Sequence, residues 1–337
     1  GFSFSLALYG GGRNGALALH LNDPLAREVI GGTGQWYVRV YRDGLYLRAF
    51  LVEQVAYGYG GGDDYISFTL VPLEQLFKRA WCVPASAGSA FATPNLPLDD
   101  AVKWIVDHSC GPHAYPSPAS GEPRVIAGLE IDAAISAHPT SRIEDSANRK
   151  CLYEFLTKFA PAYDIDFSLE LEPTSGDGNR LMFYTYYPRR GSDKTLDNGV
   201  IMPVLINDAS VHLPSGERTL NFVGVTAVIS EDLATEVRDA ATEVLCGRHE
   251  LLAQTKDANE LAALLEKNKL RDGEEWRFIE SDALRILRDF TVGDLVSVNN
   301  LTLGLDTRDE LVREIFIQVA ADGTEEITLV FGDYPKN

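Results

Sequence analysis

Apolar and polar residues alternate in five short runs within the first hundred residues of the chain. These runs are Phe2 to Tyr9, Ala16 to Leu21, Trp36 to Tyr41, Leu45 to Leu51 and Tyr65 to Val71. A period of two places successive side chains on opposite faces of a strand. Asp43 and Gly44, between the third and fourth runs, are typical of a two-residue hairpin turn. The pattern predicts a β-meander that forms a small barrel or sandwich.

Helical spacing replaces this alternation in the middle of the chain. Apolar residues repeat every three to four positions from Asn95 to Pro112 and again from Ser146 to Ala160, where Pro161 is expected to end the second helix. Three strands are expected around these helices: Val125 with Ile126, Tyr163 to Leu171, and Arg180 to Tyr187. The combination predicts a small α+β module.

The last third of the chain returns to strand patterns, with helices inserted among them. Strands are expected at Val204 to Ile206, Leu220 to Ile229, Glu314 to Val319 and Thr328 to Asp333. Ser230 is placed to cap a helix that Gly247 would end, with Leu233, Val237 and Val244 on its inward stripe. A second helix, with Leu261 inward, is expected from Asp257 to Leu270.

The stretch from Asp289 to Val298 is the one around which the chain is most easily organised. It contains a short strand, a turn at Gly293 and Asp294, and a second strand. A tight turn at this place requires a backbone conformation that only glycine adopts readily, so Gly293 is expected to have a positive φ. The inserted helices would leave the sheet before this turn and return to it here.

Composition and charge narrow the class of protein. The 337 residues, 45% hydrophobic and 23% charged, are typical of globular proteins with two or three domains. No apolar run reaches the length of a membrane span, so we expect no membrane insertion and a chain that is soluble when expressed alone. The net charge of −19 would repel phosphate backbones, which argues against stable nucleic-acid binding.

Cysteine and histidine residues give one candidate metal site. His108, Cys110 and His113 could supply three zinc ligands at the end of a helix, but their spacing matches no known metal motif. A helix-capping His108 and a buried Cys110 are the favoured interpretation. The four cysteines, Cys82, Cys110, Cys151 and Cys246, are widely spaced and are expected to be reduced, mostly buried thiols.

Carboxylate pairs are the only candidates for acid/base chemistry. Asp63 with Asp64 could bind calcium or act as an acid/base pair, although a polar hairpin tip needs the same residues. Asp164 with Asp166, and Glu170 with Glu172, have strand spacing, and we interpret them as solvated strand faces rather than a glycosidase pair. Common hydrolase signatures are absent from the sequence, so no catalytic, cofactor-binding or metal-binding residue is assigned.

Aromatic residues give one candidate binding surface. The aromatic group comprises Trp36, Tyr37, Tyr41, Tyr46, Tyr57, Tyr59, Tyr65, Tyr184, Tyr186 and Tyr187. These side chains could line a carbohydrate cleft. Packing on strand faces, or contact between subunits, is the favoured interpretation because aromatic residues are enriched in strands and at interfaces.

The order of the C-terminal elements resembles the bacteriophage tail-tip hub proteins, siphophage relatives of the myophage baseplate hub. It runs from a helix and acidic linker through an aromatic strand and the Gly293-Asp294-Leu295-Val296 turn to a β-ribbon with a late Leu-Val-Phe-Gly. The hairpin with Trp36, Val38 and Val40, followed by a strand running into Pro72 to Ala80, resembles the opening barrel of that family. The resemblance implies a ring, commonly a homotrimer, that meets the tail tube.

We therefore predict a mainly β, α+β protein in which two β-barrel-like domains flank a helix-containing module. The domains are residues 1–96, 97–200 and 201–337, the last with a helical insertion at 231–288. The predicted function is that of a structural, non-enzymatic hub at the tail tip of a phage or prophage particle, joining the tail tube to distal tail proteins. Alternatives are a tail-associated cell-wall or polysaccharide hydrolase and a sugar-binding adhesion module.

Overall fold

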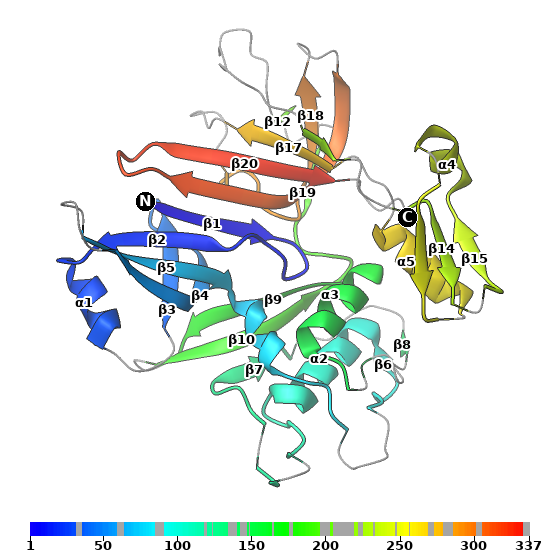
Figure 1. The fold of residues 1–337 in the computed structure, drawn as a ribbon, viewed down its shortest axis with the longest axis horizontal. Coiled ribbons are helices and arrows are strands. Elements are labelled where there is room, and N and C mark those ends of the chain that lie inside the picture. The colour runs from blue at the N-terminus through cyan, green and yellow to red at the C-terminus, as the bar shows by residue number, and fades with distance from the viewer. Residues whose placement is uncertain are drawn as a thin grey trace.

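A computed structural model gives the fold of the chain (Figure 1). The structure describes residues 1–31, 36–58, 64–84, 91–117, 120–122, 124–133, 140–141, 147, 149–163, 165–174, 178–195, 203–204, 219–221, 225–231, 233–246, 248–255, 257–268, 273–278, 286–300 and 305–332. The mainly β, α+β fold class is confirmed: β-strands are the main secondary structure, and the helices lie beside the sheets (Figure 1).

One large, curled sheet contains strands from both ends of the chain. Its path runs β13-β17-β20-β19-β1-β2-β5-β4-β3, and β18 joins β19 while β11 and β12 join β18. The N-terminal members are β1 (Phe2–Ala7), β2 (Gly15–His20), β3 (Tyr37–Arg42), β4 (Leu45–Gly58) and β5 (Tyr65–Pro72). The others are β11 (Asp193–Lys194), β12 (Pro203–Val204), β13 (Thr219–Asn221), β17 (Gly273–Phe278), β18 (Leu295–Asn300), β19 (Leu305–Val319) and β20 (Glu325–Gly332).

Strand β1 connects the two β-regions, which were predicted as two barrel-like domains, within one sheet. One edge of β1 pairs with β2, and its other edge pairs antiparallel with β19, from Phe2 opposite Val319 to Ala7 opposite Glu314. Phe4, Leu6, Ile315 and Ile317 then face a single apolar core shared by the two regions. A strand can be hydrogen-bonded on both edges, and a sequence pattern does not reveal which strand lies beyond each edge.

Four of the five N-terminal strands are confirmed to within two residues, while β4 continues seven residues beyond its predicted end at Leu51. The hairpin between β3 and β4 turns at Asp43 and Gly44, whose φ values of 50° and 78° are those of the predicted two-residue turn. The helix α1 (Pro24–Gly31) between β2 and β3 was not predicted, and Ala26 on it packs into the sheet core. The short 3₁₀ helix η1 (Leu73–Arg79) follows β5.

The middle of the chain forms the predicted α+β module. Helices α2 (Leu98–Cys110) and α3 (Leu152–Ala162) pack beside a sheet of β7 (Leu129–Ile131), β10 (Asn179–Tyr186) and β9 (Asp166–Pro173). A two-stranded ribbon, β6 (Leu96–Pro97) with β8 (Thr140–Ser141), completes the module. The short strand lies at β7 instead of the predicted Val125 and Ile126, and α3 begins six residues after the predicted Ser146.

The inserted segment forms a small module of its own at the right of Figure 1. Its sheet contains β15 (Glu236–Arg238), β14 (Ala227–Ser230) and β16 (Glu250–Ala253), with helices α4 (Ala240–Cys246) and α5 (Ala258–Asn268). The predicted helix at Asp257 to Leu270 is confirmed as α5, and Leu261 is buried. Residues Leu220 to Ile229 are not one strand, because β13 and β14 belong to different sheets.

The predicted helix starting at Ser230 is wrong in its first half. Ser230 instead begins a turn between β14 and β15, in which its side-chain oxygen accepts a hydrogen bond from the Thr235 amide at 3.1 Å. Leu233 lies in this turn with φ of 57° and is 74% exposed, while Val237 pairs with Val228 across the sheet. A serine before an acidic pair favours a helix cap or a turn through the same side-chain bond, so the local sequence does not decide between them.

In the described part of the chain, no helix combines enough length and apolar character to cross a bilayer.

Candidate functional site

The turn at Gly293 and Asp294 meets two other segments, the one after β10 and strand β19, to which it is hydrogen-bonded at Val312. Gly293 has φ of 93°, which confirms the predicted positive value. A Cβ atom on Gly293 would lie 2.3 Å from the Arg190 carbonyl oxygen, and one on Gly191 would lie 2.1 Å from the Gly293 carbonyl carbon. The segment after β10 and the turn before β18 can therefore approach this closely only because both positions are glycine.

Asp294 connects these segments through its side chain. The carboxylate is buried and accepts hydrogen bonds from the amides of Ser192 at 2.7 Å and Thr291 at 2.8 Å. The Lys194 ammonium lies 3.0 Å from the same carboxylate. The predicted strand before this turn is wrong: residues 287–289 form a turn closed by a bridge between Ile286 and Phe290. The strand begins after Asp294, at Leu295.

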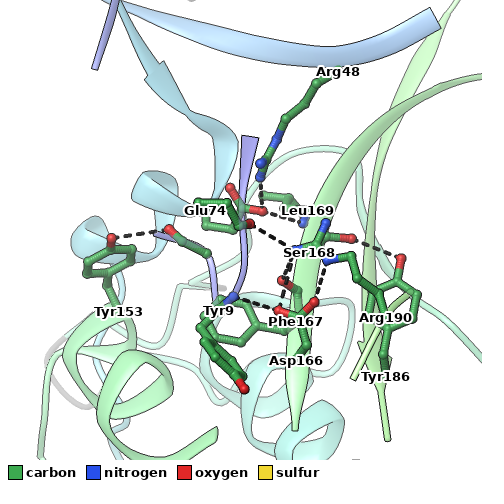
Figure 2. Close-up of polar contacts among 12 residues, drawn as sticks. Tyr9, Arg48, Glu74, Tyr153, Asp166, Phe167, Ser168, Leu169, Tyr186 and Arg190 are labelled. Carbon is green, nitrogen blue, oxygen red and sulfur yellow. Dashed lines mark hydrogen bonds and ion pairs between the residues drawn. The ribbon is translucent and has the colours of Figure 1, made fainter. Parts of the chain in front are cut away.

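A second group of charged residues holds the N-terminal β-region against the middle module (Figure 2). The Asp166 carboxylate on β9 is fully buried, accepts a hydrogen bond from the Tyr9 amide at 2.6 Å, and forms an ion pair with Arg190. The Arg190 guanidinium also donates to the carbonyl oxygens of Ala7 and Phe167, each at 3.2 Å. Arg190 therefore contacts both the N-terminal β-region and the middle module.

The Arg48 and Glu74 pair makes a similar connection deeper in the molecule (Figure 2). Arg48 on β4 and Glu74 on η1 are almost completely buried and form an ion pair. The Glu74 carboxylate also accepts a hydrogen bond from the Leu169 amide of β9 at 3.1 Å. Two buried pairs, Arg48 with Glu74 and Arg190 with Asp166, thus hold β9 against the first strands. We call these four residues the charged junction.

A pocket of about 430 Å³ adjoins the charged junction. Leu6 of β1, residues 45–48 of β4, Glu170 of β9, Arg190 with Gly191, and Leu287 with 291–292 line it. Burial raises the pKa of Glu170, and Arg48 and Arg190 partly oppose this rise. Burial, together with the nearby Glu170 carboxylate, raises the pKa of Tyr46 to about 12. The pocket therefore combines apolar walls with a carboxyl group that has lost part of its hydration.

The residues proposed as zinc ligands instead stabilise the end of α2. His108 stacks on Trp104 with ring centroids 3.9 Å apart, and its Nδ1 donates to the Trp104 carbonyl oxygen at 2.9 Å. The Cys110 thiol donates to the Val106 carbonyl oxygen, and His113 contacts Asp107 at 2.8 Å. His108 and Cys110 thus have the favoured structural roles. Among the described residues, no three metal-ligating side chains converge.

The carboxylate pairs give a mixed result. Asp63 and Asp164 lie outside the described residues, while Asp64 is exposed beside β5. The expectation of a solvated strand face is wrong for Asp166, which is fully buried, while Glu170 on the same face is half-buried and lines the pocket. Glu172 follows the expectation more closely, since it pairs with the partly exposed Arg180 at 2.9 Å.

The aromatic group does not form one continuous cleft in the described part of the chain. Tyr41 and Tyr46 pack edge to face at the β3–β4 hairpin, and Tyr57 and Tyr65 are exposed on β4 and β5. Tyr186 donates to or accepts from Ser168 at 3.2 Å, and its ring lies against Arg190. Tyr59 lies outside the described residues. These contacts agree with packing on strand faces.

The predicted buried thiols are confirmed at three of the four positions. Cys82, Cys110 and Cys151 are free and buried, and the Cys246 side chain lies outside the described residues. Burial raises the pKa of the Cys82 thiol from 9.0 to about 11 and that of Cys110 to about 12. Both thiols therefore remain protonated at neutral pH.

These raised pKa values predict a loss of stability in alkaline solution. An unfolded chain ionises its thiols near pH 9, whereas the folded chain keeps the Cys82 proton up to about pH 11. The stabilisation is therefore complete below pH 9 and is lost as the pH rises toward 11, by roughly 1.4 kcal/mol per pH unit for each thiol. Urea unfolding at pH 8, 9 and 10 measures this slope. A Cys82→Ala variant should show a shallower slope, and equal slopes would contradict the prediction.

Sequence reasoning missed Arg48, Glu74 and Arg190, the three members of the charged junction besides Asp166. A signal was present for two of them. Arg48 is the single charged residue in the apolar run from residue 45 to 52, and Glu74 is the single one from residue 65 to 77. A lone charge inside an apolar run indicates a buried ionic partner elsewhere. For Arg190, in a stretch with a second arginine and a glycine, we find no comparable signal.

Comparison with known proteins identifies the fold. No family model matches the sequence, and no curated protein matches it. The structure is similar to the crystal structure of a tail protein from Neisseria meningitidis MC58, with a TM-score of 0.57, 12% identity, and coverage of 98% of this chain and 91% of that one. It is also similar to the 43 kDa tail protein of prophage MuSo2 from Shewanella oneidensis, with a TM-score of 0.56 and 13% identity. That match covers 98% of this chain and 92% of the other.

At such low identities, the likeness concerns the fold. The matches extend over nearly the whole of both chains, so they include the curled sheet, the middle module and the inserted module together. The resemblance inferred from the order of sequence elements is thereby confirmed at this level: the chain has the fold of phage tail proteins.

Proposed function

We propose that the protein is a structural component of a phage or prophage tail tip, acting as the hub that joins the tail tube to distal tail proteins. The observation that carries this proposal is the fold match to two tail proteins over 98% of the chain. A match of this extent favours a role that uses the whole architecture, because single modules recur in proteins of many functions. The charged junction supports it, since buried pairs between modules favour one fixed arrangement of them.

Tail location is tested directly by electron microscopy. Particles from a strain whose copy of this chain carries an epitope tag should bind gold-labelled antibody at the distal end of the tail. Particles lacking the chain should have no functional tail tip. Label along the tail tube, or normal tails without the chain, would contradict the hub role.

The proposed assembly is a homotrimer, as the resemblance to hub proteins implies. Because the two β-regions share one sheet, the trimer rests on the resemblance alone. The trimer is therefore a separate proposal with its own measurement. Light scattering on the purified chain should give about three times its 37.0 kDa mass. A concentration-independent monomer mass would contradict it.

The rival hydrolase function makes an opposite prediction. We expect no cleavage of purified peptidoglycan or polysaccharide by the chain, because two of the candidate carboxylates that the structure describes are engaged in ion pairs: Asp166 pairs with Arg190 and Glu172 with Arg180. Release of soluble fragments in a turbidity or reducing-sugar assay would contradict this expectation if Asp64→Asn abolished it. An Asp322→Asn variant, in the β19–β20 turn, is the control.

A further inference from the structure

The pocket beside the charged junction contains an unbalanced negative charge. Two arginines, Arg48 and Arg190, line it, and each has a carboxylate partner that lies outside the lining. Arg48 pairs with Glu74, and Arg190 pairs with Asp166, so these four groups form two neutral pairs. Glu170 also lines the pocket, and it forms no ion pair with any residue that the structure describes. When Glu170 is ionised, one negative charge therefore remains without an ion-pair partner.

Burial makes ionisation of Glu170 energetically unfavourable when no ligand is bound. Desolvation is the largest influence on Glu170 and raises its pKa, although Arg48 and Arg190 act in the opposite direction. Both guanidinium groups are engaged by other carboxylates and do not neutralise Glu170 fully. A carboxylate that has lost hydration without gaining an ion pair is stabilised by any cation that reaches it.

The walls restrict what kind of cation fits. The pocket lining is apolar at Leu6, Leu47, Leu287 and Val292, and it also includes Tyr46. The volume of about 430 Å³ exceeds that needed for a bare metal ion. A straight alkyl chain bearing an ammonium group would bury its methylenes against the leucines and place its charge at Glu170. The aromatic ring adds a favourable contact for the same charge.

We propose that this pocket binds the aliphatic stem and ammonium group of a lysine side chain presented by a partner protein. Charge complementarity supports a basic partner, since the chain itself has a net charge of −19. The hairpin residues beside the pocket support contact with a protein, since Leu45 is 57% exposed and Tyr41 is 56% exposed. The proposal does not depend on the hub role.

Titration with n-butylammonium, which has the length of a lysine side chain, tests the proposal. We expect it to shift the methyl signals of Leu47 and Val292 in NMR spectra of the full chain. Glu170→Gln should weaken its binding by about tenfold or more, since a charge-assisted contact is lost. Glu172→Gln, two residues along the same strand, should leave the affinity unchanged.

Ligands of the same length without a positive charge test whether the pocket recognises the ammonium group. n-Butanol should bind more weakly than n-butylammonium, and butanoate should not bind measurably. Tighter binding of butanoate, or equal binding of n-butylammonium by the Glu170→Gln variant, would overturn the proposal.

A pH titration of the wild-type chain provides a test that needs no variant. The affinity for n-butylammonium should fall as the pH decreases through the pKa of Glu170, because protonation removes the charge that the ligand meets. The charged and titratable groups near Glu170 are Arg48, Glu74, Arg190, Tyr46 and Tyr186, and the Ser168 hydroxyl donates a hydrogen bond to it. The arginines keep their charge throughout. An affinity that stayed constant down to pH 3 would exclude a role for this carboxylate.

Discussion

Gly293→Ala is expected to lower the free energy of unfolding by about 2 to 6 kcal/mol, or to prevent folding. The backbone at this position has φ of 93°, a conformation that costs roughly 1 to 3 kcal/mol for a residue with a side chain. The added methyl would also lie 2.3 Å from the Arg190 carbonyl oxygen, so the segment after β10 would have to move. Overpacking of this kind costs about 1 to 3 kcal/mol more. Urea unfolding followed by circular dichroism measures the change.

Gly323→Ala is the matched control for this substitution. Gly323 lies in the turn between β19 and β20 with φ of 86°, and a Cβ atom there would have no heavy atom within 4 Å. Its replacement should cost only the conformational part, roughly 1 to 2 kcal/mol. The difference between the two variants then measures the close approach of Arg190 and Gly191 to the turn. Equal losses would mean that this approach contributes nothing.

Local elements were predicted correctly where a few neighbouring residues determine the backbone conformation. Asp43 with Gly44, and Gly293, were placed correctly because turns with positive φ select for very few residue types. The stripe on α2 and the alternation in the first part of β5 similarly reflect burial of one face. In each of these cases a few neighbouring residues are sufficient to determine the conformation.

Prediction failed where the decision depended on a distant segment. The pairing of β1 with β19 joins residues more than three hundred positions apart, and the sequence of neither strand identifies its partner. Ser230 shows the same limit locally, because its hydroxyl can bond to a helix amide or to the Thr235 amide. Asp166 was interpreted as exposed because strand alternation places it opposite Phe167 and Leu169, yet a second layer covers that face.

Asp166→Asn is expected to destabilise the chain by about 3 to 5 kcal/mol, since removal of one partner leaves a buried charge unpaired. Asp166 is fully buried and receives both the Arg190 guanidinium and the Tyr9 amide. An asparagine keeps an acceptor for the Tyr9 amide, so most of the loss should come from Arg190. Urea unfolding of Arg190→Met and of the double variant completes a cycle whose coupling energy isolates the pair.

Glu172→Gln, on the same strand, is the control for the Asp166 substitution. Its partner Arg180 is 37% exposed, so loss of that pair should cost no more than about 1 kcal/mol. Hydrogen exchange adds a positional readout. Because Asp166 and Arg190 bind the backbone of Tyr9 and Ala7, Asp166→Asn should accelerate exchange of the Tyr9 amide more than exchange of amides in α5, which lies in the inserted module. Uniform acceleration across the chain would show that the pair supports global stability without specifically holding β1 to β9.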